Sequence, residues 1–366
     1  MSRHQLSYLF AAVLAITSLS CQQQPPATAP AAPADAWNQK APPPASNGKT
    51  HLVFAGVTAN FPRIAVWLFQ GFYQTLPRGT FRGDVMYIGD GAVVATKRVC
   101  DGQTHFAITT PAAVPAMFFK GVGLASKPCP QLRGIFRLPQ RDPLTLAVRA
   151  DLGITSFEEA IQKKVAIKMS TVQDAVRAVG WLYPEFLKAY GTTEAEVESW
   201  GGKRVGADLG GQAIAKLASG EANFLLHEGD VPIAPAWKEL NQKIPMRILT
   251  ISDAVIEKLK PFGFIKYDQV LKKGQYPGVL EDVSTMDYSD WIVVADASVP
   301  DQIAYTMAQL AVEHKSDFEN QYRDMLPAGS KEMGQYVADP KWMGRDLGVP
   351  LHPGAEKYFK EKGYLP

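Results

Sequence analysis

Two successive blocks of alternating strand-like and helix-like segments most strongly limit how this chain can fold. The first block spans residues 51–148 and the second spans residues 156–250. In both blocks, short apolar runs of strand length alternate with longer runs in which apolar residues recur every three or four positions. This alternation is typical of βα units on a largely parallel sheet. The sequence therefore predicts an α/β protein with two such sheets.

Local signals place individual elements within these blocks. Ser156–Glu159 and Ser170–Gln173 both have the Ser-x-x-Glu/Gln pattern of a capping box, and each predicts a helix start. Thr110 followed by Pro111 has the pattern of an N-cap and a first-turn proline. The glycine-rich run 201–211 lacks the strand-then-helix pattern of a phosphate loop, so we expect a mobile loop there. Strands are expected at 51–55, 84–88, 105–109, 134–138, 144–148, 164–168, 223–226, 246–250 and 290–295.

The two blocks predict two lobes. The folded part of the chain, residues 50–366, holds about 317 residues, which exceeds the roughly 250–300 at which single hydrophobic cores usually stop growing. We expect the second lobe, residues 149–284, to be inserted into the first, residues 50–148 and 285–366, with crossover strands near 144–149 and 287–294. The cleft between the lobes would be the ligand site, because ligands of open α/β sheets bind outside the carboxyl ends of the strands, facing helix N-termini.

Residues 1–21 have the pattern of a secretory signal peptide. Arg3 supplies positive charge, and an apolar run at 9–16 is followed by small residues that lead to Cys21. The apolar run is shorter than the roughly 20 residues needed to span a bilayer. The expected location of the mature protein is therefore the periplasm.

The end of this signal predicts an anchor and a tether. Ser18-Leu19-Ser20-Cys21 resembles a bacterial lipobox, so Cys21 is a predicted lipidation site, and its acyl chains would be the only contact with a membrane. Ordinary cleavage further along, near the alanines at 31–36, is the alternative. Residues 22–49 are rich in Pro and Ala and have almost no large apolar side chains, which predicts an extended tether.

Charge and motifs exclude several classes of protein. The formal net charge is +2, which gives no electrostatic footprint for nucleic acid. The six histidines show no metal-ligand spacing such as His-Glu-x-x-His. A nucleophile elbow and a phosphate-loop lysine are also missing from the sequence. The sequence therefore predicts a protein without a cofactor or metal that is not an enzyme.

The chain has three cysteines, Cys21, Cys100 and Cys129. If Cys21 takes lipid, two remain in an oxidising compartment. Cys100 falls at the end of a predicted helix, and Cys129 lies in a loop bounded by prolines. We expect a Cys100–Cys129 disulfide that closes a loop of about 30 residues. Two separate buried thiols are the alternative.

Several segments resemble the TAXI-type solute receptors of TRAP transporters (tripartite ATP-independent periplasmic transporters). The resemblance begins with the strand–loop–helix opening at 51–75 and continues in LAVRADLGITSFEEAIQKKVAI at 146–167 and MSTVQDA at 169–175. It extends through QYPGVLEDVSTMDYSDWIVV at 275–294 and is most specific in PLHPGAEKYFKEKG at 350–363. It implies a two-lobe periplasmic-binding-protein fold of type II with a hinge and an interlobe cleft.

The resemblance also implies a function. The protein would capture a small organic solute, a carboxylate or an amino acid, by closing its lobes, and would deliver it to a TRAP-type membrane permease. The family's Gly-Gly-Ser-x-x-Asn stretch is replaced here at 89–94, and its segment after the third strand is replaced by Thr109-Thr110-Pro111. These departures leave open an alternative, a ligand-binding sensor that presents its liganded state to a membrane receptor.

Candidate ligand-binding residues are short polar side chains and glycines at strand ends and helix starts. Backbone N–H groups at such places bind anions, although capping or an ordinary turn explains the same residues without a ligand. Arg149 is added because its guanidinium could pair with a ligand carboxylate, with a surface ion pair as the alternative. The remaining candidates are Thr58, Ala59, Asn60, Asp90, Gly91, Thr109, Thr110, Ser170, Thr171, Gln173 and His227.

His352 lies between prolines in the C-terminal run and is the most conspicuous histidine of the chain. The run recurs in a family of proteins that are not enzymes. We therefore expect His352 to have a structural role, with its ring hydrogen-bonded to backbone.

Overall fold

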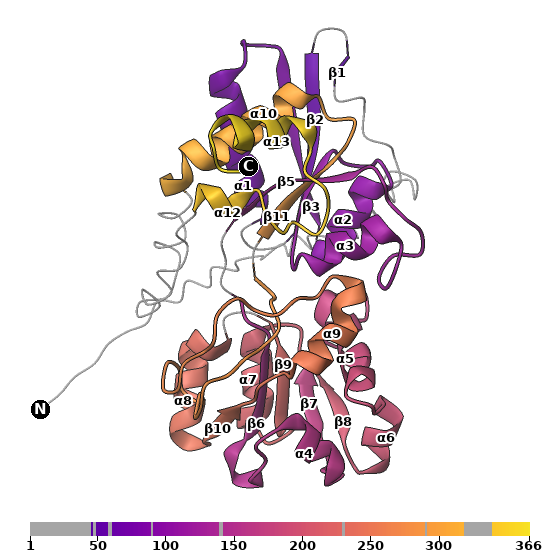
Figure 1. Ribbon diagram of the computed structural model, residues 1–366, viewed down its shortest axis with the longest axis vertical. Coiled ribbons are helices and arrows are strands. Elements are labelled where there is room, and N and C mark those ends of the chain that lie inside the picture. Colours follow the sequence, from indigo (N-terminus) through magenta and orange to yellow (C-terminus); the bar gives the residue numbers. More distant parts are fainter. Residues whose placement is uncertain are drawn as a thin grey trace, which may run out of the picture. The chain divides into compact units, whose positions relative to one another are not determined.

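The computed structural model describes residues 45–46, 49–57, 61–88, 91–138, 142–228, 231–289, 291–317 and 339–366 (Figure 1). The predicted signal peptide, its Cys21 and most of the predicted tether lie outside these ranges. Within them, the strands form one six-stranded and one five-stranded sheet, and helices alternate with the strands along the chain. The α/β class with two sheets is thus confirmed. Across the same ranges, no helix combines the length and the hydropathy needed to cross a bilayer.

The first sheet has the order β1-β2-β4-β11-β5, with β3 paired to the other side of β2. β2 runs parallel to both β3 and β4. β11 comes from much later in the chain and lies antiparallel between β4 and β5. The strands are β1 (Ala45–Ser46), β2 (Lys49–Val57), β3 (Phe81–Ile88), β4 (Phe106–Thr109), β5 (Leu132–Leu138) and β11 (Trp291–Asp296).

The helices linked to this sheet each bury one apolar face. In α1, Ile64, Leu68 and Phe72 recur every fourth position and are buried. A Cβ atom on Gly71 would lie 2.6 Å from Leu310 Cδ1, so the glycine lets α1 approach α10 closely. These helices are α1 (Phe61–Thr75), α2 (Ala92–Cys100), α3 (Ala113–Lys120), α10 (Asp301–Glu313), α12 (Pro340–Met343) and α13 (Pro353–Glu361).

The second sheet has the order β10-β6-β9-β7-β8. β7 is parallel to β8 and β9, whereas β6 is antiparallel to β9 and to β10. Its strands are β6 (Thr145–Arg149), β7 (Lys168–Thr171), β8 (Lys203–Gly206), β9 (Phe224–His227) and β10 (Met246–Ile248). Its helices are α4 (Phe157–Gln162), α5 (Ala178–Ala189), α6 (Glu194–Ser199), α7 (Gly210–Ala218), α8 (Pro235–Lys243) and α9 (Asp253–Leu259), with single turns η2 (Ala150–Leu152), η3 (Val231–Ile233) and η4 (Lys260–Phe262).

The expected strand at 164–168 and the expected helix start at Ser170 are wrong. Lys164 has a φ of 50°, and Val165 N donates to Ala160 O at 2.9 Å, so residues 163–165 terminate α4 in a left-handed turn. The strand β7 therefore begins only at Lys168 and contains Ser170 and Thr171. α5 starts eight residues later than its capping-box signal, at Ala178. The capping box at Ser156 is confirmed, because Ser156 Oγ accepts from Glu159 N at 3.1 Å.

Two further local predictions are corrected by the structure. Thr110 is not an N-cap, because α3 begins at Ala113 with Ala112 as its N-cap, and Pro111 O accepts from Val114 N in a turn before the helix. The glycine-rich run 201–211 is not one mobile loop. It contains β8, which pairs in register with β7, and the first turn of α7.

Two crossovers connect the sheets, and they pair with each other. The first leads from β5 to β6 and the second from the end of the second sheet to β11. Leu144 N donates to Met286 O at 3.0 Å, and Tyr288 N donates to Asp142 O at 3.0 Å. β6 pairs only within the second sheet, so the first crossover ends before Thr145. Along the chain, the strands of the second sheet lie between β5 and β11.

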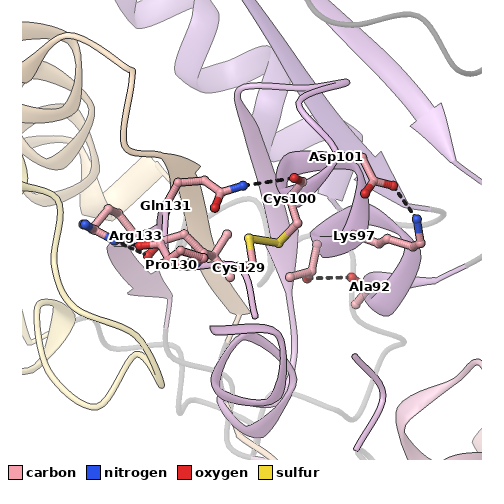
Figure 2. The surroundings of a disulfide bond; sticks show 10 residues. Ala92, Lys97, Cys100, Asp101, Cys129, Pro130, Gln131 and Arg133 are labelled. Carbon is pink, nitrogen blue, oxygen red and sulfur yellow. Dashed lines mark hydrogen bonds and ion pairs between the residues drawn. A yellow bond between two sulfur atoms is a disulfide. The ribbon is translucent and has the colours of Figure 1, made fainter. Parts of the chain in front are cut away.

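A disulfide joins Cys100 at the end of α2 to Cys129, which is the pairing expected from the sequence (Figure 2). The Gln131 side chain donates from Nε2 to Cys100 O at 3.0 Å and supports the same junction. The bridge spans 29 residues and so restrains α2 and α3 together with the strand between them.

Replacing both bridge cysteines with alanine should lower the free energy of unfolding by about 3 kcal/mol, because the unfolded chain regains the entropy of a loop of this length. Urea denaturation of the oxidised wild type and of the double variant measures the difference. The reduced wild type is the matched control and should unfold close to the double variant. Equal stability of all three would show that the bridge does not restrain the unfolded chain.

His352 has the structural role expected from the sequence. It is the N-cap of α13, is 1% exposed, and its Nδ1 accepts from Gly354 N at 3.3 Å. Its own backbone N donates to Gly134 O in β5, so the residue ties α13 to the first sheet. Burial is the largest influence on the ring and lowers the pKa of His352 below its ordinary value, against the opposing charge of Asp301.

The lowered pKa of His352 predicts a loss of stability in mild acid. As the pH falls below about 6.5, the ordinary pKa of histidine, His352 binds a proton in the unfolded chain but not yet in the folded protein. Proton binding stabilises the unfolded state, so the free energy of unfolding falls. His352→Asn keeps a capping acceptor and removes the titration, so its stability should fall less between pH 7.5 and pH 5.5. His314→Gln, at an exposed histidine, should retain the wild-type profile. Parallel profiles for His352→Asn and wild type would contradict the prediction.

Candidate functional site

The carboxyl ends of the parallel strands of the first sheet lie along one edge. Val57 is paired with Ile88, and the register of β2 with β4 places Thr109 level with them. The loops that follow these strands contain most of the first-lobe candidates. Thr58, Ala59, Asn60 and Asp90 lie outside the described residues. Gly91 is the N-cap of α2, has a φ of 95° and provides no side-chain cap.

The second sheet has an equivalent edge. Thr171, the last residue of β7, pairs with Gly206 at the end of β8, and His227 ends the neighbouring strand β9. His227 pairs with Thr145 at the start of β6, so this edge adjoins the first crossover. The structure therefore brings the candidates Ser170, Thr171, Gln173 and His227 to one edge.

Arg149 does not belong to this group. β6 is antiparallel to β9, so the last residue of β6 lies beside the first residues of β9, and Arg149 N donates to Asn223 O. Its guanidinium binds the carboxylate of Asp151, with Nη2–Oδ2 at 2.6 Å and Nε–Oδ1 at 3.2 Å. This hydrogen bonding lowers the pKa of Asp151 and raises that of Arg149. The ligand role predicted for Arg149 is thus replaced by a local ion pair at the opposite edge of the sheet.

The two carboxyl edges adjoin the same pair of crossovers. β5 leaves the first sheet at Leu138, which pairs with Trp291 at the start of β11, and β6 enters the second sheet opposite His227. The described residues belong to one compact unit. In it, Arg177 Cγ lies 4.0 Å from the position that a Cβ would take on Gly91. The start of α5 thus approaches the start of α2.

Three candidates carry a buried polar atom that has no hydrogen-bond partner among the described residues. These atoms are Thr109 Oγ1, Thr171 Oγ1 and His227 Nε2. The three residues are 0%, 0% and 2% exposed. Most buried polar side-chain atoms in proteins are hydrogen-bonded, so each of these needs an explanation. All three lie at the last residue of a parallel strand, which is where the fold predicts a ligand.

Other candidates have roles within the fold. Ser170 Oγ donates to Ala213 O at 3.2 Å and so joins β7 to α7. Gln173 is exposed, and its Oε1 would be 3.1 Å from a Cβ on Gly206. His227 Nδ1 lies 3.0 Å from Glu228 O, which fixes the orientation of the ring. The ring therefore holds its Nε2 atom in a defined direction.

Arg177 is part of this region and was not among the candidates, and Tyr288 lies in the adjoining second crossover. Arg177 is half-buried, and the structure gives its guanidinium no ion pair or hydrogen bond with a described residue. The sequence placed the helix start at Ser170, so Arg177 fell inside the expected helix instead of at its beginning. Tyr288, in the second crossover, is fully buried, and burial together with the nearby Glu228 carboxylate raises its pKa well above the ordinary value.

The described residues contain no group of His, Cys, Asp and Glu side chains that could hold a metal ion. A cavity of about 580 Å³ adjoins the disulfide and is lined by Lys97, Asp101 and Gln131 among others. It lies where α2 ends and β4 begins, which is the opposite edge of the sheet from Thr109. This cavity is therefore separate from the candidate site.

Solved structures match this chain with TM-scores below 0.5 and at low sequence identity. XAC2383 from Xanthomonas citri bound to ATP has a TM-score of 0.49 and 10% identity, covering 85% of this chain and 98% of that one. The periplasmic binding protein BugD has a TM-score of 0.46 and 13% identity, covering 86% and 99%. The alkanesulfonate-binding protein SsuA from Xanthomonas axonopodis pv. citri bound to MOPS has a TM-score of 0.41 and 10% identity, covering 78% and 83%.

Comparison with protein families gives a match over most of the chain. The model of the NMT1-like family matches residues 87–363. This range includes all strands of the second sheet, both crossovers and β11. The α/β fold with two sheets is shown by the strand topology. The chain belongs to the NMT1-like family.

Proposed function

We propose that this protein is an extracytoplasmic receptor that captures a small organic solute at the carboxyl edges of its two sheets. The observation that carries the proposal is the set of unpaired buried polar atoms on Thr109, Thr171 and His227. A buried donor or acceptor without a hydrogen-bond partner lowers the stability of the folded protein by about 1–3 kcal/mol. A solute that hydrogen-bonds to them would recover this free energy, which makes the three positions suited to ligand recognition.

Solute capture would proceed by closure of the lobes. The covalent connections between the sheets are the two crossovers, which pair with each other through Leu144 N–Met286 O and Tyr288 N–Asp142 O. A hinge made of a few extended residues can absorb the dihedral changes that closure requires. A solute that contacts Thr109 in one lobe and Thr171 or His227 in the other binds the closed form better, and this difference in affinity drives closure.

The solute that fits these residues is a carboxylate or an amino acid. Arg177 supplies a guanidinium that has no partner among the described residues, and it lies close to Gly91 at the start of α2. A guanidinium pairs with a carboxylate through two parallel hydrogen bonds. The sequence predicted that Arg149 pairs with a solute carboxylate, and this role is now proposed for Arg177 instead.

The resemblance to TAXI-type receptors supports delivery of the solute to a TRAP-type permease. A signal peptide and a lipid on Cys21 would keep the receptor in the periplasm, tethered to a membrane. The departures at 89–94 and at Thr109–Pro111 favour a second candidate function, in which the same closure presents the receptor to a membrane sensor. Copurification with permease subunits, rather than with a sensor kinase, would distinguish the two.

A thermal-shift screen with succinate, citrate, L-aspartate, L-leucine and benzoate tests solute binding. A solute present at a hundred times its dissociation constant stabilises the folded state by about 2.7 kcal/mol, which should raise Tm by several degrees. Arg177→Gln should abolish most of the shift given by a carboxylate. The matched control, Arg149→Gln, lies at the opposite edge and should keep the full shift. No shift with any solute of the panel, or equal loss in both variants, would count against the proposal.

Thr171→Val and Thr109→Val test the same site through stability. Each removes a buried hydroxyl that has no partner among the described residues, so each should raise the free energy of unfolding of the solute-free protein by about 1 kcal/mol while reducing the solute-induced shift. Thr306→Val is the matched control, because Thr306 is equally buried but its Oγ1 donates to Gln302 O at 2.8 Å. It should lower stability by about 1 kcal/mol. A loss of stability in the Thr171 and Thr109 variants would show that their hydroxyls are satisfied within the fold.

A further inference from the structure

Arg204 in β8 binds the segment that connects β7 to α5. We call residues 172–177 the β7–α5 loop. Arg204 Nη1 donates to Val172 O at 3.4 Å and to Gln173 O at 3.3 Å. The same nitrogen also lies 3.4 Å from Gly180 O in the first turn of α5. One guanidinium thus contacts both ends of the connection between the strand and the helix.

The guanidinium is itself held in place from two further directions. Arg204 Nε donates to Glu194 Oε1 on α6 at 2.7 Å. Its Cζ atom lies 4.8 Å from the ring centre of Tyr183, which is 1% exposed. The Arg204 side chain is only 13% exposed. The guanidinium of Arg204, which is mostly buried and lies over a ring, is held more firmly than one in a solvated surface pair.

The β7–α5 loop packs tightly against its neighbours. A Cβ on Gly180 would lie 2.0 Å from Asp174 O, and Gln173 lies directly against Gly206. Val176 N donates to Asp174 Oδ1, and Arg177 N donates to Asp174 O. These contacts define one conformation of the loop, and Arg204 holds it from the side of β8.

The loop carries or adjoins the groups assigned to solute binding in the second lobe. It follows Thr171 and ends at Arg177. We propose that Arg204 is a positioning residue that holds the β7–α5 loop in its solute-binding conformation before the solute arrives. This inference rests on the proposed function. A loop ordered in advance does not have to lose its conformational entropy on binding, so affinity is higher.

Lysine cannot replace arginine in this arrangement. The guanidinium directs Nε to Glu194 and Nη1 to the loop carbonyls at the same time, whereas an ammonium group is a single point of donation. Arg204→Lys therefore keeps the positive charge near Glu194 but should release the loop. This separates the positioning role from a simple charge requirement.

The test uses the solute-free protein and compares Arg204→Lys with Arg247→Lys. Arg247 lies in β10 of the same sheet and pairs with Glu281 at 3.2 Å, but it contacts no part of the loop. Amide hydrogen exchange of residues 172–177, and the rate of trypsin cleavage after Arg177, should rise about tenfold or more in Arg204→Lys and stay unchanged in Arg247→Lys. Exchange within β7 and β9 should be unaffected in both. Unchanged exchange in the loop of Arg204→Lys would overturn the inference.

The solute panel supplies the functional arm of the same experiment. For each solute that stabilises the wild type, Arg204→Lys should reduce the thermal shift by more than half, whereas a merely structural residue would lower Tm and leave the shift intact. If no solute stabilises the wild type, the proposed function fails, while the exchange data still decide whether Arg204 orders the loop. If Arg204→Lys does not fold, Glu194→Gln takes its place, and an unchanged rate of trypsin cleavage after Arg177 in that variant would overturn the inference.

Discussion

The first sheet depends on β11, a strand that the chain supplies only after the whole second sheet. β11 lies between β4 and β5, and its Ile292, Val293 and Val294 side chains are fully buried. Without it, both neighbouring strands would have an unpaired edge in the core of the lobe. Pairing over such a long sequence separation requires the loop entropy to be overcome first. The same return path places the second crossover against the first, and so brings the carboxyl edges of both sheets to one junction.

The residues of the proposed site lower the stability of the solute-free protein. Buried polar groups are normally hydrogen-bonded, and here one atom each of Thr109, Thr171 and His227 has no partner among the described residues. Strain of this kind concentrates at functional sites, where a ligand completes what the fold leaves open. The loop after β7, by contrast, is held in place by several contacts. Arg204 fixes the loop after β7 by hydrogen bonds to its carbonyl oxygens, so the binding groups do not depend on the solute for their order.

Hydrophobic periodicity predicted most helices and strands, but two short sequence patterns led to wrong predictions. The Ser-x-x-Gln pattern at Ser170 has the composition of a capping box, yet Ser170 pairs with Val205 and Leu225 as a strand residue. The strand expected at 164–168 begins only at Lys168, because Lys164 adopts a left-handed conformation in the turn that follows α4. Arg149 was assigned to the site because its strand direction was not known. These errors share one cause, since strand pairing overrides local preference.

The sequence by itself determined the α/β class and the order of most elements, because these depend on hydrophobic periodicity. It predicted the Cys100–Cys129 pairing with two separate thiols as the alternative, and the structural role of His352 was implied by the family resemblance. The tertiary structure decided which residues meet. Strand register places Arg149 at the edge of the second sheet opposite His227, and it places Thr171 near His227. It also sets Arg204 against a loop some 30 residues away in the chain. Register is a property of pairs of strands, and no single segment of sequence contains it.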